Sequence, residues 1–246
     1  MPELNPQITI VGGGLAGSEC AYQLAEMGHR VRLYEMRDGT KSTPAHRTDR
    51  LAELVCSNSF GSTTDYSAPG QLKWEAAKLG SMILRVAQDC AVPAGMALGI
   101  DREKFAEGVT RILEAHPNIE IRRETVTSLD QIPRPAVIAT GPLTDDALAR
   151  SMRRHFDDEF MYFFDAIAPI IDADSIDQYV AYKADRFGKG NKDYYNCPLN
   201  KEQYENLINE IKAARKVEAK DFEKDTPYFE SCMPIEAIIE RGDQTL

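Results

Sequence analysis

A short apolar run that breaks into a cluster of glycines near the N-terminus is the feature that most constrains the fold. Residues 8–11 form a β-branched run, and the chain then continues as Gly12-Gly13-Gly14-Leu15-Ala16-Gly17. Residues 18–27 have the apolar spacing of a helix, and residues 31–35 alternate as a strand does and end on Glu35. Strand, glycine turn, helix, strand and acid follow one another within about 30 residues, which is the order of a dinucleotide-binding unit. This order predicts an α/β fold with a Rossmann-like, doubly wound sheet.

Each glycine of the motif is needed for a different structural reason. Gly12 permits the tight turn, Gly14 lets the backbone approach a pyrophosphate, and Gly17 lets the helix pack against the strand. The helix N-terminus then offers N–H groups and the positive end of its dipole to the phosphates. Glu35 is predicted to accept hydrogen bonds from the adenosine ribose, and FAD is the predicted dinucleotide. The alternative is a glycine turn that binds no nucleotide. The predicted cofactor-binding residues of the turn are Gly12, Gly13, Gly14, Leu15, Ala16 and Gly17.

Further along, two strands are predicted at residues 119–123 and 136–140. The second ends in Thr140-Gly141, a small-residue turn that would bring backbone close to the nucleotide in a doubly wound sheet. Thr140 and Gly141 therefore complete the predicted cofactor site.

Helices are predicted at residues 72–88 and 102–115, the latter with Asp101 as its N-cap. Residues 38–70 are rich in Thr, Ser, Asn, Gly and Pro, and this stretch is long for a structureless connection. It is predicted to be a functional loop, and Cys56 lies inside it.

Composition narrows the class of protein. A chain of 246 residues can bury one sizeable core or two modest ones without a disulfide or a metal. The five cysteines are scattered, with no C-x-x-C pair, which predicts reduced thiols and no metal site.

The N-terminus reaches glycine too soon for a signal peptide, and no apolar run approaches the roughly 20 residues that span a bilayer, so a cytoplasmic protein is expected. A net charge of -10 leaves any nucleic-acid site to a local patch.

Beyond about residue 144 the sequence changes to charged and aromatic-rich segments. This change predicts a FAD-binding domain at 1–143 and an inserted α+β substrate domain at 144–246. The second domain carries charged helices at 145–155 and 201–220 and an aromatic-rich stretch at 160–171. Residues 179–195 interleave basic with aromatic side chains, a mixture that can neutralise phosphates and stack bases. A solvated hairpin with the aromatic rings packed beneath it is the alternative. The candidate phosphate contacts are Lys183, Arg186, Lys189 and Lys192.

Several segments together carry a resemblance to a known family. They are GGGLAGSECAYQLAEMG, VRLYEMR, TPAHRTDRLAELVCSNSF, VPAGMALGIDREKF, VIATGPLT, YYNCPLN and YFESCMPIEAIIERGDQTL. The chain closely resembles the folate- and FAD-dependent tRNA (uracil-5-)-methyltransferases, a family once named as a Gid division protein. The resemblance covers essentially the entire chain. Many flavoproteins share the glycine turn, so the specificity lies in the LVCSNS and CMPIE segments.

The resemblance implies an enzyme that forms 5-methyluridine in the T loop of tRNA. The one-carbon unit would come from 5,10-methylenetetrahydrofolate, and the reducing equivalents from NAD(P)H through FAD. Carbon 5 of uracil is a poor nucleophile until a thiolate adds at carbon 6. The resemblance implies Cys232 as that nucleophile, with Cys56 helping to remove the proton from carbon 5. The remaining cysteines, Cys20, Cys90 and Cys197, are interpreted as buried small hydrophobic residues.

The resembled family continues beyond Leu246 and returns to the FAD domain with a second glycine-rich segment. We therefore expect an N-terminal fragment of a flavoprotein of the GR2 type, without the segment that completes the flavin site. Other functions stay open: a flavoprotein that modifies the wobble uridine of tRNA, an enzyme that methylates a ribosomal RNA uridine, and an NAD(P)H-dependent flavin oxidoreductase. From a different class, a non-catalytic nucleotide-binding remnant also fits the residues.

Overall fold

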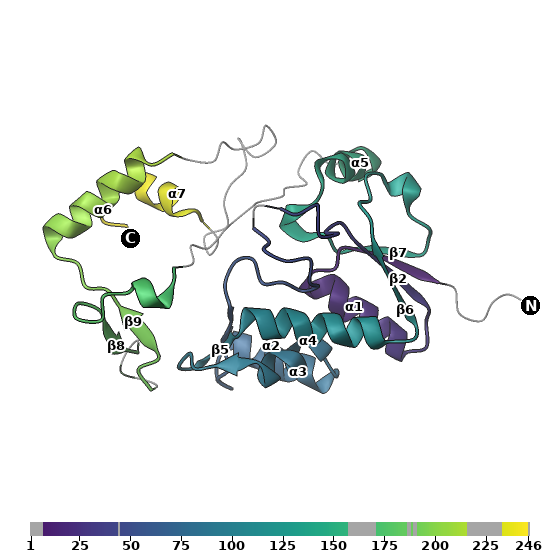
Figure 1. Ribbon diagram of the computed structural model, residues 1–246, viewed down its shortest axis with the longest axis horizontal. Helices are drawn as coiled ribbons and strands as arrows, with labels where there is room; N and C mark the ends of the chain where they lie inside the picture. The colour runs from purple at the N-terminus through teal and green to yellow at the C-terminus, as the bar shows by residue number, and fades with distance from the viewer. Residues whose placement is uncertain are drawn as a thin grey trace, which may run out of the picture. The chain divides into compact units, whose positions relative to one another are not determined.

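The computed structural model describes residues 7–43, 45–156, 171–185, 188, 191–215 and 233–245 (Figure 1). The chain divides into two compact units, residues 1–163 and 164–246. Within the described residues, no helix is long and apolar enough to cross a membrane.

A four-stranded parallel sheet forms the centre of the first unit, in the order β6-β2-β1-β7. Because β2 lies on one side of β1 and β7 on the other, the strand order reverses at β1, and a crevice opens there at the carboxyl ends of the strands. The predicted α/β class and Rossmann-like sheet are confirmed. The strands are β1 (Ile8–Val11), β2 (Val31–Glu35), β6 (Ile119–Arg123) and β7 (Ala136–Ile138).

Helices cover both faces of this sheet (Figure 1). Ile10 of β1 belongs to a core shared with Ala21 of α1 (Leu15–Glu26) and Phe105 of α4 (Arg102–Ala115). The next residue, Val11, packs instead with Leu148 of α5 (Asp146–Phe156). Successive strand residues point to opposite faces, so adjacent positions of β1 belong to different cores. Two 3-10 turns, η1 (Leu129–Gln131) and η2 (Gly141–Leu143), connect β6, β7 and α5.

The predicted single helix at 72–88 is wrong, because the structure has two helices there. They are α2 (Ala68–Lys78) and α3 (Met82–Asp89). Between them Gly80 has φ +77°, a left-handed conformation that a helix interior does not allow. Ser81 then caps α3, and the Glu19 carboxylate of α1 accepts hydrogen bonds from the Met82 and Ile83 amides at 3.1 and 2.8 Å. The apolar spacing of α3 thus begins a new helix that α1 holds in place.

The segment 38–70 is not without secondary structure, in contrast to the prediction. It contains β3 (Ser59–Ser62), and α2 begins inside it. β3 pairs antiparallel with β5 (Ala97–Ile100), which also pairs with β4 (Ala91–Val92), in the order β3-β5-β4. A strand of sequence Ser-Phe-Gly-Ser lacks the apolar alternation by which a strand is recognised, and its pairing comes from a distant part of the chain.

The second unit contains a hairpin of β8 (Tyr182–Ala184) and β9 (Tyr194–Asn196), together with η3 (Ala173–Ser175). Helices α6 (Lys201–Ala213) and α7 (Ile235–Glu240) contribute buried Ile208 and Ile239. The helix predicted at 201–220 ends at Ala213, and residues 216–220 lie outside the described residues. The aromatic-rich stretch 160–171 also lies outside them, except for Ile171.

Candidate functional site

Two of the motif glycines are required by the fold of the turn itself. Gly12 has φ +106°, and a Cβ there would lie 2.5 Å from the Ala139 carbonyl oxygen. A Cβ on Gly17 would lie 1.8 Å from the Gly12 oxygen, so the first turn of α1 could not approach the glycine turn. A Cβ on Gly14, by contrast, would meet no atom of the described chain within 4 Å. Gly12 and Gly17 therefore shape the turn, whereas Gly14 leaves space open beside it.

The N-terminus of α1 lacks the side-chain cap that the neighbouring helices have. Ser67, Ser81 and Asp101 each accept a hydrogen bond from an amide in the first turn of α2, α3 and α4. The N-cap of α1 is Gly14, with no side-chain acceptor in the described chain and no acidic residue in the first turn. The first-turn amides and the positive end of the helix dipole are thus available to an anion from outside the chain.

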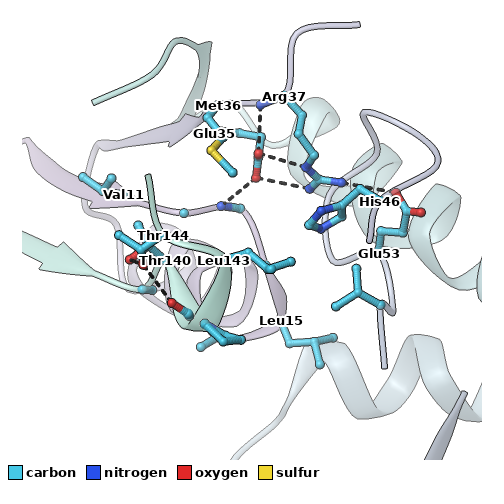
Figure 2. A pocket seen from close by; sticks show the side chains of 18 of the residues that line it. Val11, Leu15, Glu35, Met36, Arg37, His46, Glu53, Thr140, Leu143 and Thr144 are labelled. Atoms are coloured by element: carbon cyan, nitrogen blue, oxygen red, sulfur yellow. Dashed lines mark hydrogen bonds and ion pairs between the residues drawn. The ribbon is translucent and has the colours of Figure 1, made fainter. Parts of the chain in front are cut away.

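A cavity of about 500 Å³ opens at this end of α1 (Figure 2). Its walls come from the carboxyl ends of the central strands and from the loop that carries Cys56. The predicted site residues Thr140 and Gly141 border the same cavity as the glycine turn, and so does Cys56. Strand ends that are far apart in sequence therefore meet at one place, where open α/β sheets bind ligands. The lining also includes His46, Glu53, Thr125 and Val126, which the sequence analysis did not single out.

Glu35 lies at the end of β2 as predicted, and it is only 6% exposed. Its Oε2 accepts hydrogen bonds from the Gly13 amide at 3.0 Å and from Arg37 Nη2 at 3.2 Å. Its Oε1 accepts from the Arg37 amide and Nε, both at 3.0 Å. Burial alone would raise the pKa of Glu35, but the hydrogen bonds and charge of Arg37, with the Gly13 amide, outweigh it and lower the pKa.

These four hydrogen bonds fill the acceptor sites of the Glu35 carboxylate, which offers about four. A ribose hydroxyl reaches Glu35 only by replacing one of the present donors. The predicted ribose contact thus stays a prediction, and in this structure the carboxylate holds the glycine turn. The residue that the sequence analysis missed is Arg37, which stands two positions after the motif acid.

Arg37 links this acid to the loop that follows, and its side chain is 2% exposed. Its Nη1 donates to Glu53 Oε2 at 3.3 Å (Figure 2). The same Nη1 donates to the Thr48 carbonyl oxygen at 3.3 Å. Glu53 in turn accepts from the Arg47 amide at 2.8 Å and from the Thr48 hydroxyl at 2.7 Å. One guanidinium therefore joins two carboxylates, one at the strand end and one in the loop.

The same loop is bonded directly to the glycine turn and to α4. The Ala52 amide donates to the Gly13 oxygen at 2.8 Å, and the Leu51 amide donates to Thr110 Oγ1 of α4 at 2.8 Å. A Cβ on Gly13 would lie 2.5 Å from Leu51 Cδ2, which shows how closely the loop approaches. The glycine turn, the end of β2 and the beginning of the cysteine loop thus form one hydrogen-bonded assembly.

The cysteines occupy different environments. Cys56 is exposed at the rim of the cavity, whereas Cys20 and Cys90 are half-buried. Burial raises the pKa of the Cys20 thiol, and burial, followed by the charge of nearby aspartates, raises that of Cys90. Cys197 is exposed directly after β9, so its interpretation as buried is wrong. It precedes a proline at the end of a hairpin, where no core covers it. Cys232 lies outside the described residues.

Two of the four basic candidates, Lys183 and Lys192, lie in the hairpin region of the second unit. Lys183 lies on β8, and its Nζ stands 5.0 Å from the centre of the Tyr195 ring. Lys192 lies in the connection between the strands, with φ +60°. Arg186 and Lys189 lie outside the described residues.

Comparison with known proteins gives a family and several relatives. The family model described as "Glucose inhibited division protein A" matches residues 7–246. The chain is 66% identical, over 98% of its length, to the methylenetetrahydrofolate-tRNA-(uracil-5-)-methyltransferase TrmFO of Bdellovibrio bacteriovorus, of which it covers 54%. It is 49% identical to the TrmFO of Persephonella marina and 48% to that of Aquifex aeolicus, covering 98% and 99% of this chain and 55% and 54% of theirs.

The chain spans about half the length of the curated relatives it matches. Among solved structures, that of Aquifex aeolicus GidA in the form II crystal is similar, with a TM-score of 0.56 and 16% identity. The match covers 84% of this chain and 43% of the other. At that identity the similarity shows the fold.

The lowered pKa of Glu35 predicts a specific acid sensitivity. A carboxyl group whose folded pKa lies below its unfolded value of about 4.3 stabilises the fold above that pH, and this contribution is lost as the pH falls through the folded pKa. We expect Glu35→Gln to lower the free energy of unfolding at pH 7 by about 1–3 kcal/mol. We also expect it to flatten the decline between about pH 5 and 2. Urea titrations across this range measure both effects.

The matched control is Glu114→Gln, an exposed glutamate on α4. It should change the free energy of unfolding by less than about 0.5 kcal/mol at every pH. An acid limb in Glu35→Gln that coincides with that of the wild type would contradict the assignment of a stabilising carboxylate.

Proposed function

The chain belongs to the glucose inhibited division protein A family, and on that premise we propose that it is part of a folate-dependent tRNA (uracil-5-)-methyltransferase. The reaction would form 5-methyluridine in the T loop of tRNA, with 5,10-methylenetetrahydrofolate as the carbon donor and NAD(P)H as the reductant. The observation that carries the proposal is the cavity in which Cys56 meets the uncapped end of α1. The same proposal places the protein in the cytoplasm, where tRNA and folate are found.

The described residues fit FAD. The pyrophosphate would lie against the first-turn amides of α1, because the helix has no side-chain acceptor of its own there and Gly14 leaves room beside it. Thr140 and Gly141, after β7, would close over the same group, and Glu35 would lie beside the adenosine ribose. FAD, when bound, supplies the reducing equivalents that come from NAD(P)H. The task of the chain is to bind and orient this cofactor next to Cys56.

Two cysteines would carry the chemistry on the uridine. The Cys232 thiolate would form a bond to carbon 6, which moves the electron pair of the double bond to carbon 5 and makes it nucleophilic. After carbon 5 has bonded to the one-carbon unit, Cys56 would take the proton from carbon 5 while the bond between that unit and its carrier breaks, which leaves an exocyclic methylene. A hydride, whose electrons come from NAD(P)H, would turn this methylene into the methyl group, and the Cys232 thiolate would leave as the double bond between carbons 5 and 6 reforms. The position of Cys56 at the cavity rim supports its part. The CMPIE segment supports the part of Cys232.

The β8–β9 hairpin is the proposed contact for tRNA. Lys183 pairs across the strands with Tyr195, so both lie on one face, while Tyr182 and Tyr194 lie on the opposite face. The side chains of Tyr182, Tyr194 and Tyr195 are 56%, 46% and 38% exposed. Their exposure favours rings that can stack on bases over rings packed beneath the hairpin. Lys183 and Lys192, with Arg186 and Lys189, would supply local positive charge in an otherwise acidic chain.

Two of the motif glycines, Gly14 and Gly17, provide a test of the proposed nucleotide site. Gly14→Val should abolish FAD retention, because its side chain would enter the open space that we assign to the pyrophosphate. It should leave the protein folded and lower the free energy of unfolding by only about 1 kcal/mol, because valine is a poorer N-cap residue than glycine. Gly17→Val is the contrasting variant, because its side chain would collide with the Gly12 carbonyl oxygen. This variant should have a lower free energy of unfolding than the wild type. Flavin absorbance after purification and urea unfolding measure the two properties. Normal flavin content in a folded Gly14→Val protein would refute the proposed site.

The tRNA contact is tested by the salt dependence of binding. Changing Lys183, Arg186, Lys189 and Lys192 to Ala should weaken tRNA binding for all sequences. It should also reduce the slope of log K against log salt by about 0.7–0.9 for each phosphate contact that is lost. Lys201→Ala, an exposed lysine of α6 in the same unit, is the control and should leave the slope close to that of the wild type. Fluorescence anisotropy between 50 and about 200 mM salt measures it. An unchanged slope in the fourfold variant would show that the hairpin is not the tRNA contact.

A further inference from the structure

Arg102 connects two of the segments that carry the family resemblance. It is the first residue of α4, and its side chain extends toward the cysteine loop. Its Nη1 donates to the Leu54 carbonyl oxygen and its Nη2 to the Cys56 carbonyl oxygen, each at 3.1 Å. One guanidinium thus holds the backbone on both sides of Val55, and the second bond is to Cys56 itself.

The backbone next to Arg102 is itself held in place. Asp101 caps α4 by accepting from the Lys104 amide at 3.2 Å, and the Asp101 amide donates to the Cys90 carbonyl oxygen at 2.9 Å. Ile100, one position earlier, is fully buried. Arg102 therefore reaches the loop from a rigid point, which is what a positioning group needs.

The loop is also held just beyond Cys56. The Ile100 amide donates to the Asn58 carbonyl oxygen at 2.8 Å, and Asn58 Nδ2 donates to the Ile100 carbonyl oxygen at 3.1 Å. With Ala52 bonded to Gly13 on the other side, Cys56 lies between two anchored points. Arg102 holds the middle of this span.

Hydrogen bonds, rather than hydrophobic packing, fix the position of Cys56. Cys56 and Ser57 are exposed, so no hydrophobic burial fixes their place, whereas Leu54 is buried. A group that moves a proton at a substrate atom must be held close to its productive geometry. Arginine suits this positioning role because its planar guanidinium can donate to two carbonyls in a fixed geometry, whereas a lysine ammonium is a compact point charge on a flexible stem.

We propose that Arg102 is a positioning residue that fixes Cys56 at the rim of the cavity by holding the Leu54 and Cys56 carbonyls. It acts through the loop and does not touch the substrate. The inference rests on the proposed function, in which Cys56 takes part in the reaction. The structural claim, that Arg102 holds the Cys56 backbone, can be tested without an assay of methyl transfer.

The first measurement reports the mobility of Cys56 directly. A nitroxide spin label is attached to Cys56 in the full chain after the other four cysteines are changed to Ser. We expect Arg102→Ala to shorten the rotational correlation time of the label at least twofold, and Arg102→Lys to give an intermediate value. Arg111→Ala, an exposed arginine on the same helix, is the control and should match the parent. A parental spectrum in Arg102→Ala would overturn the proposal.

The second measurement uses a protein of the relatives' full length. Arg102→Ala should lower kcat for methyl transfer tenfold or more, while flavin content and the KM for tRNA stay within twofold of the wild type. Arg102→Lys should recover part of kcat. A wild-type kcat in Arg102→Ala would overturn the proposal, and so would an equal loss in Arg102→Lys and Arg102→Ala.

Failure of the proposed function has a different signature. If Cys56→Ala transfers methyl groups at the normal rate, the part assigned to Cys56 is wrong, and with it the catalytic consequence of Arg102. The spin-label spectra would still decide whether Arg102 holds the loop.

Discussion

The buried contact of Arg37 with Glu35 and Glu53 is the interaction on which the rest of the site depends. Charges removed from water are costly unless they are paired and hydrogen-bonded, and here one guanidinium lies between two carboxylates. The backbone amides of Gly13 and Arg47 donate to those carboxylates as well. Removing Arg37 would leave two carboxylates without their cation, whereas removing either carboxylate would leave Arg37 with one of its two partners. The network therefore fixes the glycine turn, the end of β2 and the loop as one body.

This body explains how a fold shared by many proteins can place a thiol beside the proposed nucleotide site. The parallel sheet brings the ends of β1, β2 and β7 to one crevice, and α1 presents an uncapped N-terminus there. The loop reaches the same crevice because Ala52 bonds to Gly13 and Arg37 bonds to Glu53. Helix α4 also holds the loop, through Thr110 and Arg102. Cys56 is thus carried by a rigid scaffold although its own side chain is exposed.

The sequence predicted the parts of this arrangement that are local. The β1–α1–β2 unit is recognisable because its periodicities, its glycines and its terminal acid lie within one short segment. The sequence could not predict the contacts between distant residues: Glu53, the partner of Arg37 in the loop, is 16 positions away, and the carbonyl partners of Arg102 are 46 and 48 positions away. The break between α2 and α3 had a local signal in Gly80-Ser81, which the continuous apolar spacing outweighed. The exposure of Cys197 had none beyond its neighbouring proline.

The most direct measurement of the central claim uses tRNA that carries 5-fluorouridine at the T-loop position, incubated with methylenetetrahydrofolate, NAD(P)H and a protein of the relatives' full length. Fluorine at carbon 5 cannot leave as a proton, so a thioether at carbon 6 persists and the peptide that bears it can be identified by mass. The account predicts a covalent adduct at Cys232, and the adduct should accumulate in a protein that retains its flavin. An adduct at Cys56 would reverse the two roles. Methylation of ordinary tRNA at the normal rate by Cys232→Ala, with no adduct at either cysteine, would contradict the covalent mechanism.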